Sequence, residues 1–139
     1  MEHMLEELRQ ILAASKTIAV VGLSNKPDRP SNEIAAYLKA QGYRIIPVNP
    51  TITEALGERA YASLREIPGG VDVVEVFRKS EDVPPIVDDA IAIGAKVVWM
   101  QEGIAHEEAA ARARAAGLKV VMDTCMRATH RALREQGKI

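Results

Sequence analysis

Three glycines organise the chain, because each ends a helical pattern and precedes a short aliphatic run. Amphipathic periodicity stops at Gly42, Gly94 and Gly117, and a strand-like run begins within three positions of each. Glycine readily adopts the left-handed backbone that ends a helix. A helix followed at once by a buried strand is typical of a right-handed βαβ crossover. The pattern predicts an α/β fold, a Rossmann-like, doubly wound sheet of five parallel strands.

The periodicity predicts five strands and five helices. The strands are apolar runs, as expected where helices cover both faces of a sheet, at residues 17–21, 44–48, 71–76, 97–100 and 119–122. The helices are predicted at 3–14, 31–39, 81–93, 106–116 and 127–135, with a polar loop at 49–58 and a weakly helical piece at 62–67. By analogy with dinucleotide-binding sheets, the predicted strand order is 71–76, 44–48, 17–21, 97–100, 119–122.

The composition fits one globular domain over residues 1–139, with residues 1–15 as an N-terminal helix packed on it. The charge is −1, from 18 basic and 19 acidic residues, which argues against nucleic acid or an anionic membrane as partner. The acidic start lacks a signal-peptide pattern, and no apolar run is long enough to span a bilayer. With a single cysteine, Cys125, and no zinc-like spacing, we expect a cytoplasmic protein without a metal.

In such a sheet the ligand crevice lies beyond the carboxyl ends of the strands, where the order reverses, here predicted between strands 17–21 and 97–100. The first of these strands leads through a glycine into a loop and a helix N-terminus, an arrangement that attracts phosphate. The residues expected to hold an anion there are Gly22, Ser24, Lys26, Arg29 and Ser31. The alternative is that Gly22 only makes a tight turn.

The dinucleotide fingerprint G-x-G-x-x-G is absent after strand 17–21, where Gly22 is followed by Leu23 and Ser24. Strand 44–48 also lacks the acidic residue that holds the ribose in NAD-binding proteins, since it ends in Val48, Asn49 and Pro50. The sequence therefore does not favour NAD as the ligand.

Four motifs carry a resemblance to a known family: Val21-Gly-Leu-Ser-Asn-Lys-Pro, Ile46-Pro-Val-Asn-Pro, Val76-Phe-Arg and Val98-Trp-Met-Gln-Glu-Gly. With these motifs in this order, the chain resembles the stand-alone CoA-binding proteins. That family is similar to the CoA-binding domain of the succinyl-CoA synthetase alpha subunit. The resemblance runs from about Leu8 to Leu133.

The resemblance implies a position for each part of coenzyme A. The pyrophosphate would lie on Gly22, Leu23 and Ser24, with Arg29 as a phosphate partner. The remaining implied contacts are Val48, Asn49 and Pro50 around the adenosine, Val76, Phe77 and Arg78 beside the nucleotide and pantetheine, and Gln101, Glu102 and Gly103 on the far side of the crevice.

The chain departs from the synthetase at two places. A basic residue follows the second strand there, whereas this chain has Thr51, Ile52 and Thr53, so the partner of the 3′-phosphate is not identified. The synthetase carries its phosphorylated histidine in a second domain, and this sequence ends at Ile139, so we expect no ligase reaction.

Several side chains near the crevice have two interpretations. Trp99 and Phe77 either stack on a base or belong to the core. Cys125 either reacts with the CoA thiol or acts as a nucleophile, or it is a buried free cysteine. Glu102 with Asp123 is either a catalytic carboxyl pair or a pair of loop residues. The main hypothesis is a protein that binds CoA or an acyl-CoA without catalysis and has no identified protein partner. The alternatives are an NAD(P)-dependent oxidoreductase, an acyl-CoA converting enzyme using Glu102 or Cys125, and an interaction domain.

Overall fold

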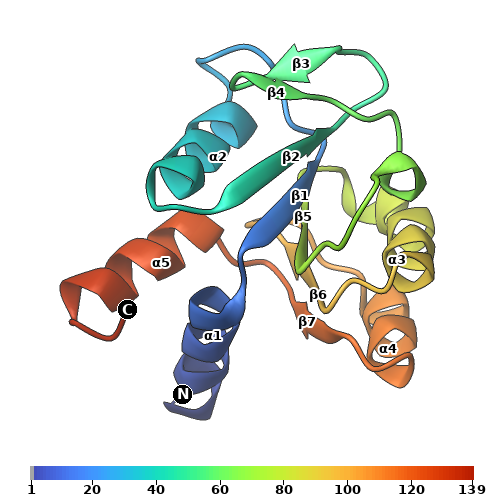
Figure 1. Cartoon of the computed structure of the whole chain (residues 1–139). Coiled ribbons are helices and arrows are strands. Elements are labelled where there is room, and N and C mark those ends of the chain that lie inside the picture. Colours follow the sequence, from blue (N-terminus) through green and yellow to red (C-terminus); the bar gives the residue numbers. More distant parts are fainter. Residues whose placement is uncertain (1) are drawn as a thin grey trace.

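The computed structural model describes residues 2–139, with side chains described from Met4 onward (Figure 1). Five strands form one parallel sheet, which confirms the predicted fold class. They are β1 (Thr17–Val21), β2 (Arg44–Val48), β5 (Val73–Val76), β6 (Val97–Met100) and β7 (Lys119–Val121). The helices are α1 (Glu2–Ala14), α2 (Pro30–Ala40), α3 (Val83–Ala92), α4 (Glu107–Ala115) and α5 (Met126–Glu135), with 3₁₀ turns η1 (Leu64–Glu66) and η2 (Ser80–Asp82).

The sheet lies between two helical layers, with α1, α2 and α5 on one face and α3 and α4 on the other (Figure 1). Each face has its own hydrophobic core. Ile18 and Val20 of β1 point to the α2 and α5 side, whereas Ala19 and Val21 point to the α3 and α4 side. Because successive side chains of a strand point to opposite faces, strands covered on both sides must be apolar throughout. This is why the strands were recognisable from the sequence.

The predicted strand order is wrong. The observed order is β2-β1-β5-β6-β7, so β5 pairs with β1 and β2 stands at the sheet edge. Pro47 supplies a physical reason. Proline has no amide to donate to a ladder, and it is therefore tolerated in an edge strand and disfavoured in a strand flanked on both sides. The sequence prediction had placed residues 44–48 between two neighbours.

The segment between β2 and β5 also differs from the prediction. A small antiparallel hairpin, β3 (Glu54–Ala55) with β4 (Glu58–Arg59), replaces the expected polar loop. Lys39 of α2 holds it, because its Nζ donates to the carbonyl of Leu56 at 2.6 Å and lies 3.1 Å from the Glu58 carboxylate. The weakly helical piece is only the short η1 turn. After the hairpin, Tyr61 bridges to Val48, so the chain returns to the carboxyl end of β2.

Two classes of feature are absent from the described residues. None of the helices in residues 2–139 has the length and apolar character needed to cross a membrane. Within the same range no three His, Cys, Asp or Glu side chains come together as a group that could hold a metal ion.

Candidate functional site

The order of the strands reverses between β1 and β5, so the crevice opens at the carboxyl ends of these two strands. This corrects the predicted position between strands 17–21 and 97–100. The loop after β1 leads to α2 on one face of the sheet, and the loop after β5 leads to α3 on the other (Figure 1). As a consequence, the loops that begin at Gly22 and Phe77 are direct neighbours.

The close approach of the loop at Phe77 requires a glycine at position 22. Its φ is +91°, and a Cβ built on it would overlap the backbone carbonyl of Phe77 and come within 3.4 Å of Cδ of Arg78. Its own amide donates to the carbonyl of Val48 at 2.8 Å. The glycine thus allows β2, β1 and β5 to converge at one point, a structural role close to the tight-turn alternative considered from the sequence.

The β1 loop is shaped by two serines. The hydroxyl of Ser31 accepts the amide of Ser24 at 3.0 Å, and the hydroxyl of Ser24 accepts the amide of Lys26 at 3.1 Å. Asn32 also donates its side-chain amide to the carbonyl of Ser24 at 2.9 Å. These bonds fold the loop against the first turn of α2, and because each hydroxyl oxygen acts only as acceptor here, its own hydrogen remains free to donate to a ligand.

The start of α2 lies beside the α5 cleft, which Pro30 lines, and its next two residues, Ser31 and Asn32, are buried. Arg29 occupies the N-cap position without a side-chain cap, and Pro30 follows as the first helical residue. The Glu33 amide is bonded to the carbonyl of Arg29 at 3.0 Å. The preceding amides, those of Ser31 and Asn32, have no intrahelical partner, since the first turn of a helix lacks acceptors for them. Unpaired N–H groups and the helix dipole generally favour an anion at the start of a helix.

Asn49 joins the loops that follow β1 and β2. Its side chain is buried, donates to the carbonyl of Leu23 at 3.1 Å, and accepts the amide and hydroxyl of Thr51 at 3.0 and 2.8 Å. Leu23 and Val76 are fully buried. The side chains of Leu23, Asn49 and Val76 are therefore not available to a ligand. These residues can contact a ligand only through their backbone atoms, or affect it by shaping the loops.

Two hollows flank Arg78 at the carboxyl edge. The β2 hollow, about 280 Å³, is lined by Val21, Val48, Pro50, Ala62, Ser63, Leu64, Arg78, Asp82, Ile86 and Asp89. The α5 cleft, about 580 Å³, is lined by Pro30, Ile34, Phe77, Arg78, Lys79, Asp82, Gln101, Glu102, Ile104, Cys125 and Arg127. Arg78 and Asp82 belong to both, so their side chains separate two compartments of one site.

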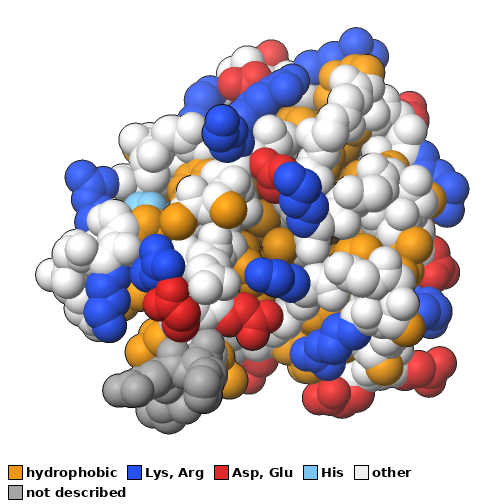
Figure 2. Space-filling view, turned by 60° about the horizontal axis from the view of Figure 1, so that its bottom comes forward, with side chains coloured by type: hydrophobic (Ala, Val, Ile, Leu, Met, Phe, Trp, Pro, Cys, Tyr) orange, Lys and Arg blue, Asp and Glu red, His pale blue; other side chains and the backbone are white. Residues whose placement is uncertain are grey.

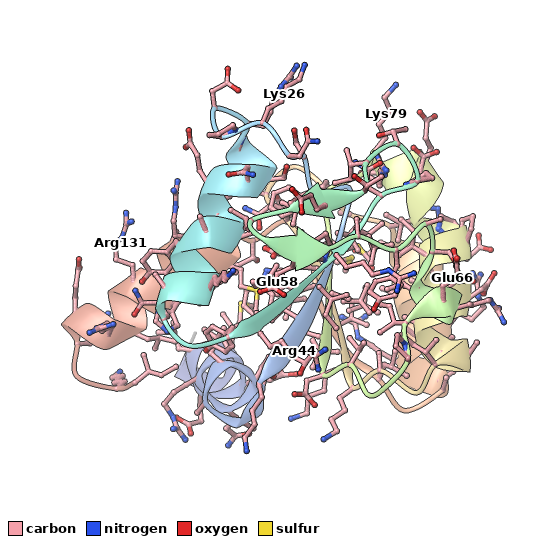
Figure 3. All side chains as sticks on the ribbon, turned by 45° about the horizontal axis from the view of Figure 1, so that its top comes forward. Lys26, Arg44, Glu58, Glu66, Lys79 and Arg131 are labelled. Atoms are coloured by element: carbon pink, nitrogen blue, oxygen red, sulfur yellow. The ribbon has the colours of Figure 1, made fainter. Side chains whose placement is uncertain are left out.

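The hollows bring together only some of the predicted residues. Val48, Pro50 and Arg78 meet in the β2 hollow, and Phe77, Arg78, Gln101 and Glu102 meet in the α5 cleft. The predicted residues that line neither are Gly22, Leu23, Ser24, Lys26, Arg29, Ser31, Asn49, Val76 and Gly103. Most of these belong to the β1 loop, between the two compartments. In Figure 3 Lys26 and Lys79 both project from this edge.

Sequence reasoning missed the walls that come from η1, α2 and α3. Leu64, Ile86 and Asp89 line the β2 hollow because β5 lies beside β1, which brings the segments before and after β5 to the crevice. Ile34 of α2 lines the α5 cleft and was not among the predicted site residues. The edge position implied by Pro47 was the available signal.

The side chains with two interpretations are placed as follows. Trp99 is fully buried and donates from Nε1 to the carbonyl of Thr124 at 2.8 Å, so it belongs to the core, whereas Phe77 is half-buried at the α5 cleft. Asp123 accepts the amide of Gly103 at 2.6 Å and so joins two crevice loops. Cys125 lines the α5 cleft at the N-cap of α5, and its Sγ accepts the amide of Ala128 at 3.5 Å.

A carboxyl group that the sequence analysis did not single out lies beneath this edge. Glu75, in β5, has no exposed surface, and neither of its carboxylate oxygens has a hydrogen-bond partner among the described residues. Burial raises the pKa of this carboxyl from 4.5 to about 8. Glu75 is therefore protonated at neutral pH.

Comparisons with known proteins add to this geometry. A family model described as CoA binding domain matches residues 16–131. YneT of Bacillus subtilis is 47% identical over 124 residues, which cover 89% of this chain and 92% of YneT. The alpha subunit of an ADP-forming acetate–CoA ligase of Pyrococcus furiosus is 46% identical over 57 residues, 40% of this chain and 12% of the subunit. A solved structure of a hypothetical protein from Pyrococcus horikoshii has a TM-score of 0.91 at 42% identity, covering 94% of this chain and 92% of that one.

Proposed function

The chain belongs to the family of CoA-binding domains, and on that premise we propose that it binds coenzyme A or an acyl-CoA in the crevice between β1 and β5. The observation that carries the proposal is the pair of hollows on either side of Arg78, with the first turn of α2 beside them. CoA has two dissimilar ends joined by a pyrophosphate. A site with two compartments and an anion-binding point between them fits such a ligand.

The pyrophosphate is assigned to the β1 loop and the start of α2. The amides of Ser31 and Asn32 would donate to it, and the hydroxyls of Ser24 and Ser31 have hydrogens to offer. Arg78 lies against Gly22, where its guanidinium can reach an anion held by this loop. Gly22 contributes by letting the loops converge.

The adenosine is assigned to the β2 hollow and the pantetheine to the α5 cleft. The β2 hollow is mostly apolar, with Val48, Pro50 and Leu64 in its walls, which suits a flat base. The α5 cleft is larger and mixed in character, with Phe77 and Ile34 beside Gln101 and Glu102. An extended chain with amide groups and methylenes matches such a lining.

Individual basic side chains at this edge are available to an anionic ligand. The crevice loops carry five basic residues, Lys26, Arg29, Arg78, Lys79 and Arg127. The ion pairs found among the described side chains involve none of these five. Acidic residues stand in the same loops, namely Asp28, Glu81, Asp82, Glu102 and Asp123, so the crevice offers individual cations to an anion and has no net positive charge.

We further propose that the protein performs no chemistry on the ligand by itself. The two acids considered from the sequence have ordinary loop environments, since Asp123 is bonded to the Gly103 amide and Glu102 is exposed. Cys125 has a backbone amide as its hydrogen-bonding neighbour and no basic side chain bonded to it among the described residues. Incubation of the protein with acetyl-CoA, followed by a thiol assay, tests this. Release of free CoA above the rate without protein contradicts it.

Thermal melting with CoA, acetyl-CoA, NAD and NADP added separately tests the binding proposal. A ligand at about 100 times its Kd adds roughly 2.7 kcal/mol to the free energy of unfolding, so CoA compounds should raise the Tm. If NAD raised the Tm and CoA did not, the proposal would be wrong.

Arg78→Ala locates the site by calorimetry. Loss of a charge-assisted bond to phosphate costs about 1.5–3 kcal/mol, which corresponds to roughly ten- to a hundredfold weaker CoA binding. Arg114→Ala is the matched control, since Arg114 is an exposed arginine at the carboxyl end of α4, away from the crevice. Equal affinity of Arg78→Ala and wild type for CoA would remove Arg78 from the site.

A further inference from the structure

The apolar stripe of α1 is longer than the surface that covers it. Leu8, Ile11 and Leu12 are buried, with exposed fractions of 8%, 3% and 2%. Met4 and Leu5 continue the same stripe at helical spacing, yet they are 66% and 40% exposed. The first turns of α1 therefore project beyond the domain with their apolar side uncovered.

A hollow lies beside the other end of the same helix. The α1 hollow, about 460 Å³, lies between the last turn of α1 and the two turns that precede β6 and β7. Ile11, Ala14, Ile91 and Leu118 provide apolar walls, and Lys96 and Lys119 are the basic residues that line it. It is at the amino ends of the strands, opposite the crevice. Figure 2 shows hydrophobic side chains among Lys and Arg on this face of the molecule.

Charge distinguishes the projecting end of α1 from the hollow. Glu7 is exposed and stands three residues after Met4 and four before Ile11, so it borders the apolar stripe on the side that faces the hollow. In the hollow, Lys119 is exposed, and the Nζ of Lys96 lies 3.5 Å from a carboxylate oxygen of Asp72. The projecting end thus offers an acidic and apolar surface, and the hollow a basic and apolar one.

We propose that two copies of this chain form a dimer in which their α1 helices run antiparallel. Met4 and Leu5 of each copy then cover the α1 hollow of the other, with Glu7 facing Lys119. The helix has 13 residues and is about 20 Å long, so antiparallel pairing brings the first turn of one helix beside the last turn of its partner. In a two-fold dimer every contact occurs twice, and the projecting stripe and the hollow belong to one face of one chain.

A second copy is the occupant because both halves of the contact are present in the same chain. The apolar stripe with its acidic neighbour is complementary to an apolar hollow with basic neighbours, and the chain presents one of each. The antiparallel pairing of two copies therefore buries the exposed stripe and the hollow of each copy at the same time. The inference does not depend on CoA, since the crevice lies at the opposite edge of the sheet.

Sedimentation velocity over a range of protein concentrations tests the dimer. We expect the wild type to reach twice the chain mass of 15.1 kDa. Met4→Asp places a charge on the exposed stripe without removing a buried side chain, and it should give a monomer with an unchanged circular dichroism spectrum. Wild-type protein that stays monomeric at all concentrations would refute the proposal, and so would a dimer that Met4→Asp leaves intact.

A charge exchange tests the register. Glu7→Lys should raise the dimer Kd roughly tenfold or more, because it sets two positive charges against each other. The double variant Glu7→Lys with Lys119→Glu should restore dimerisation. Glu66→Lys is the matched control, since Glu66 is exposed on η1, remote from α1 (Figure 3). If Glu66→Lys weakened the dimer as much as Glu7→Lys, or the double variant failed to recover, the proposed contact would be wrong.

Discussion

Glu75 makes the stability of this protein depend on pH in a way that one substitution can reveal. Its side chain belongs to β5, between Val20 of β1 and Trp99 of β6, at the centre of the sheet. It has no exposed surface and no hydrogen-bond partner among the described residues. The fold therefore accommodates the neutral carboxyl group and opposes the carboxylate. We expect Glu75→Gln, which stays neutral at every pH, to change how stability responds to pH.

The size of the effect follows from the two pKa values. Burial raises the pKa from 4.5 to about 8 in the folded protein. The stability that neutral Glu75 contributes is complete below about pH 4.5, declines as the unfolded chain ionises, and is lost by about pH 8, where the folded protein ionises too. Each pKa unit corresponds to about 1.4 kcal/mol, so the loss approaches 5 kcal/mol. That is a large part of the stability of an ordinary domain.

Urea unfolding of wild type and Glu75→Gln at a series of pH values measures this loss. The free energy of unfolding of Glu75→Gln minus that of wild type should rise by about 1.4 kcal/mol per pH unit between about pH 5 and pH 8. The subtraction cancels the other titrating groups and any constant cost of the buried amide. Glu54→Gln, at an exposed position in β3, should show no such slope. A flat difference for Glu75→Gln would mean that Glu75 ionises normally in the folded protein and would refute the reasoning.

Three further substitutions have defined outcomes. Asp72→Asn should lower the free energy of unfolding at neutral pH by about 1–3 kcal/mol, because the Asp72 carboxylate accepts the two amides at the start of β1 and these bonds hold its pKa low. The difference from wild type should vanish in acid, because stability that comes from a lowered pKa is lost as the pH falls. An unchanged urea midpoint at neutral pH would contradict this prediction. Asn49→Ala should lower the Tm and weaken CoA binding together, because the β1 and β2 loops lose their link; calorimetry showing full affinity would separate Asn49 from the site. Gly22→Val should lower the Tm of the ligand-free protein, because the new side chain meets the carbonyl of Phe77, and a Tm equal to that of wild type would show that the strands can separate there.

Much of the fold was readable from the sequence because it depends on local physics. Helix periodicity, glycine caps and apolar strands are properties of short segments, and they located the five strands and five helices to within a few residues. The same patterns predicted a crevice at the carboxyl ends of the strands, and both the β2 hollow and the α5 cleft lie at that edge. The motifs around Gly22, Pro47 and Arg78 led to the family, and the family match confirms that reading.

The tertiary structure decided which strands are neighbours and therefore which residues meet. Pairing of β5 with β1 joins segments more than fifty residues apart, and no periodicity within a segment encodes that choice. It sets Phe77 against Gly22, gives Gly22 its steric requirement, and brings the walls of η1 and α3 to the β2 hollow. Glu75 illustrates the same limit. A single acid in an apolar run is predicted as part of a strand, and its burial cannot be inferred from that run. Only the packing of both neighbouring strands and the covering helices removes water from its carboxyl group.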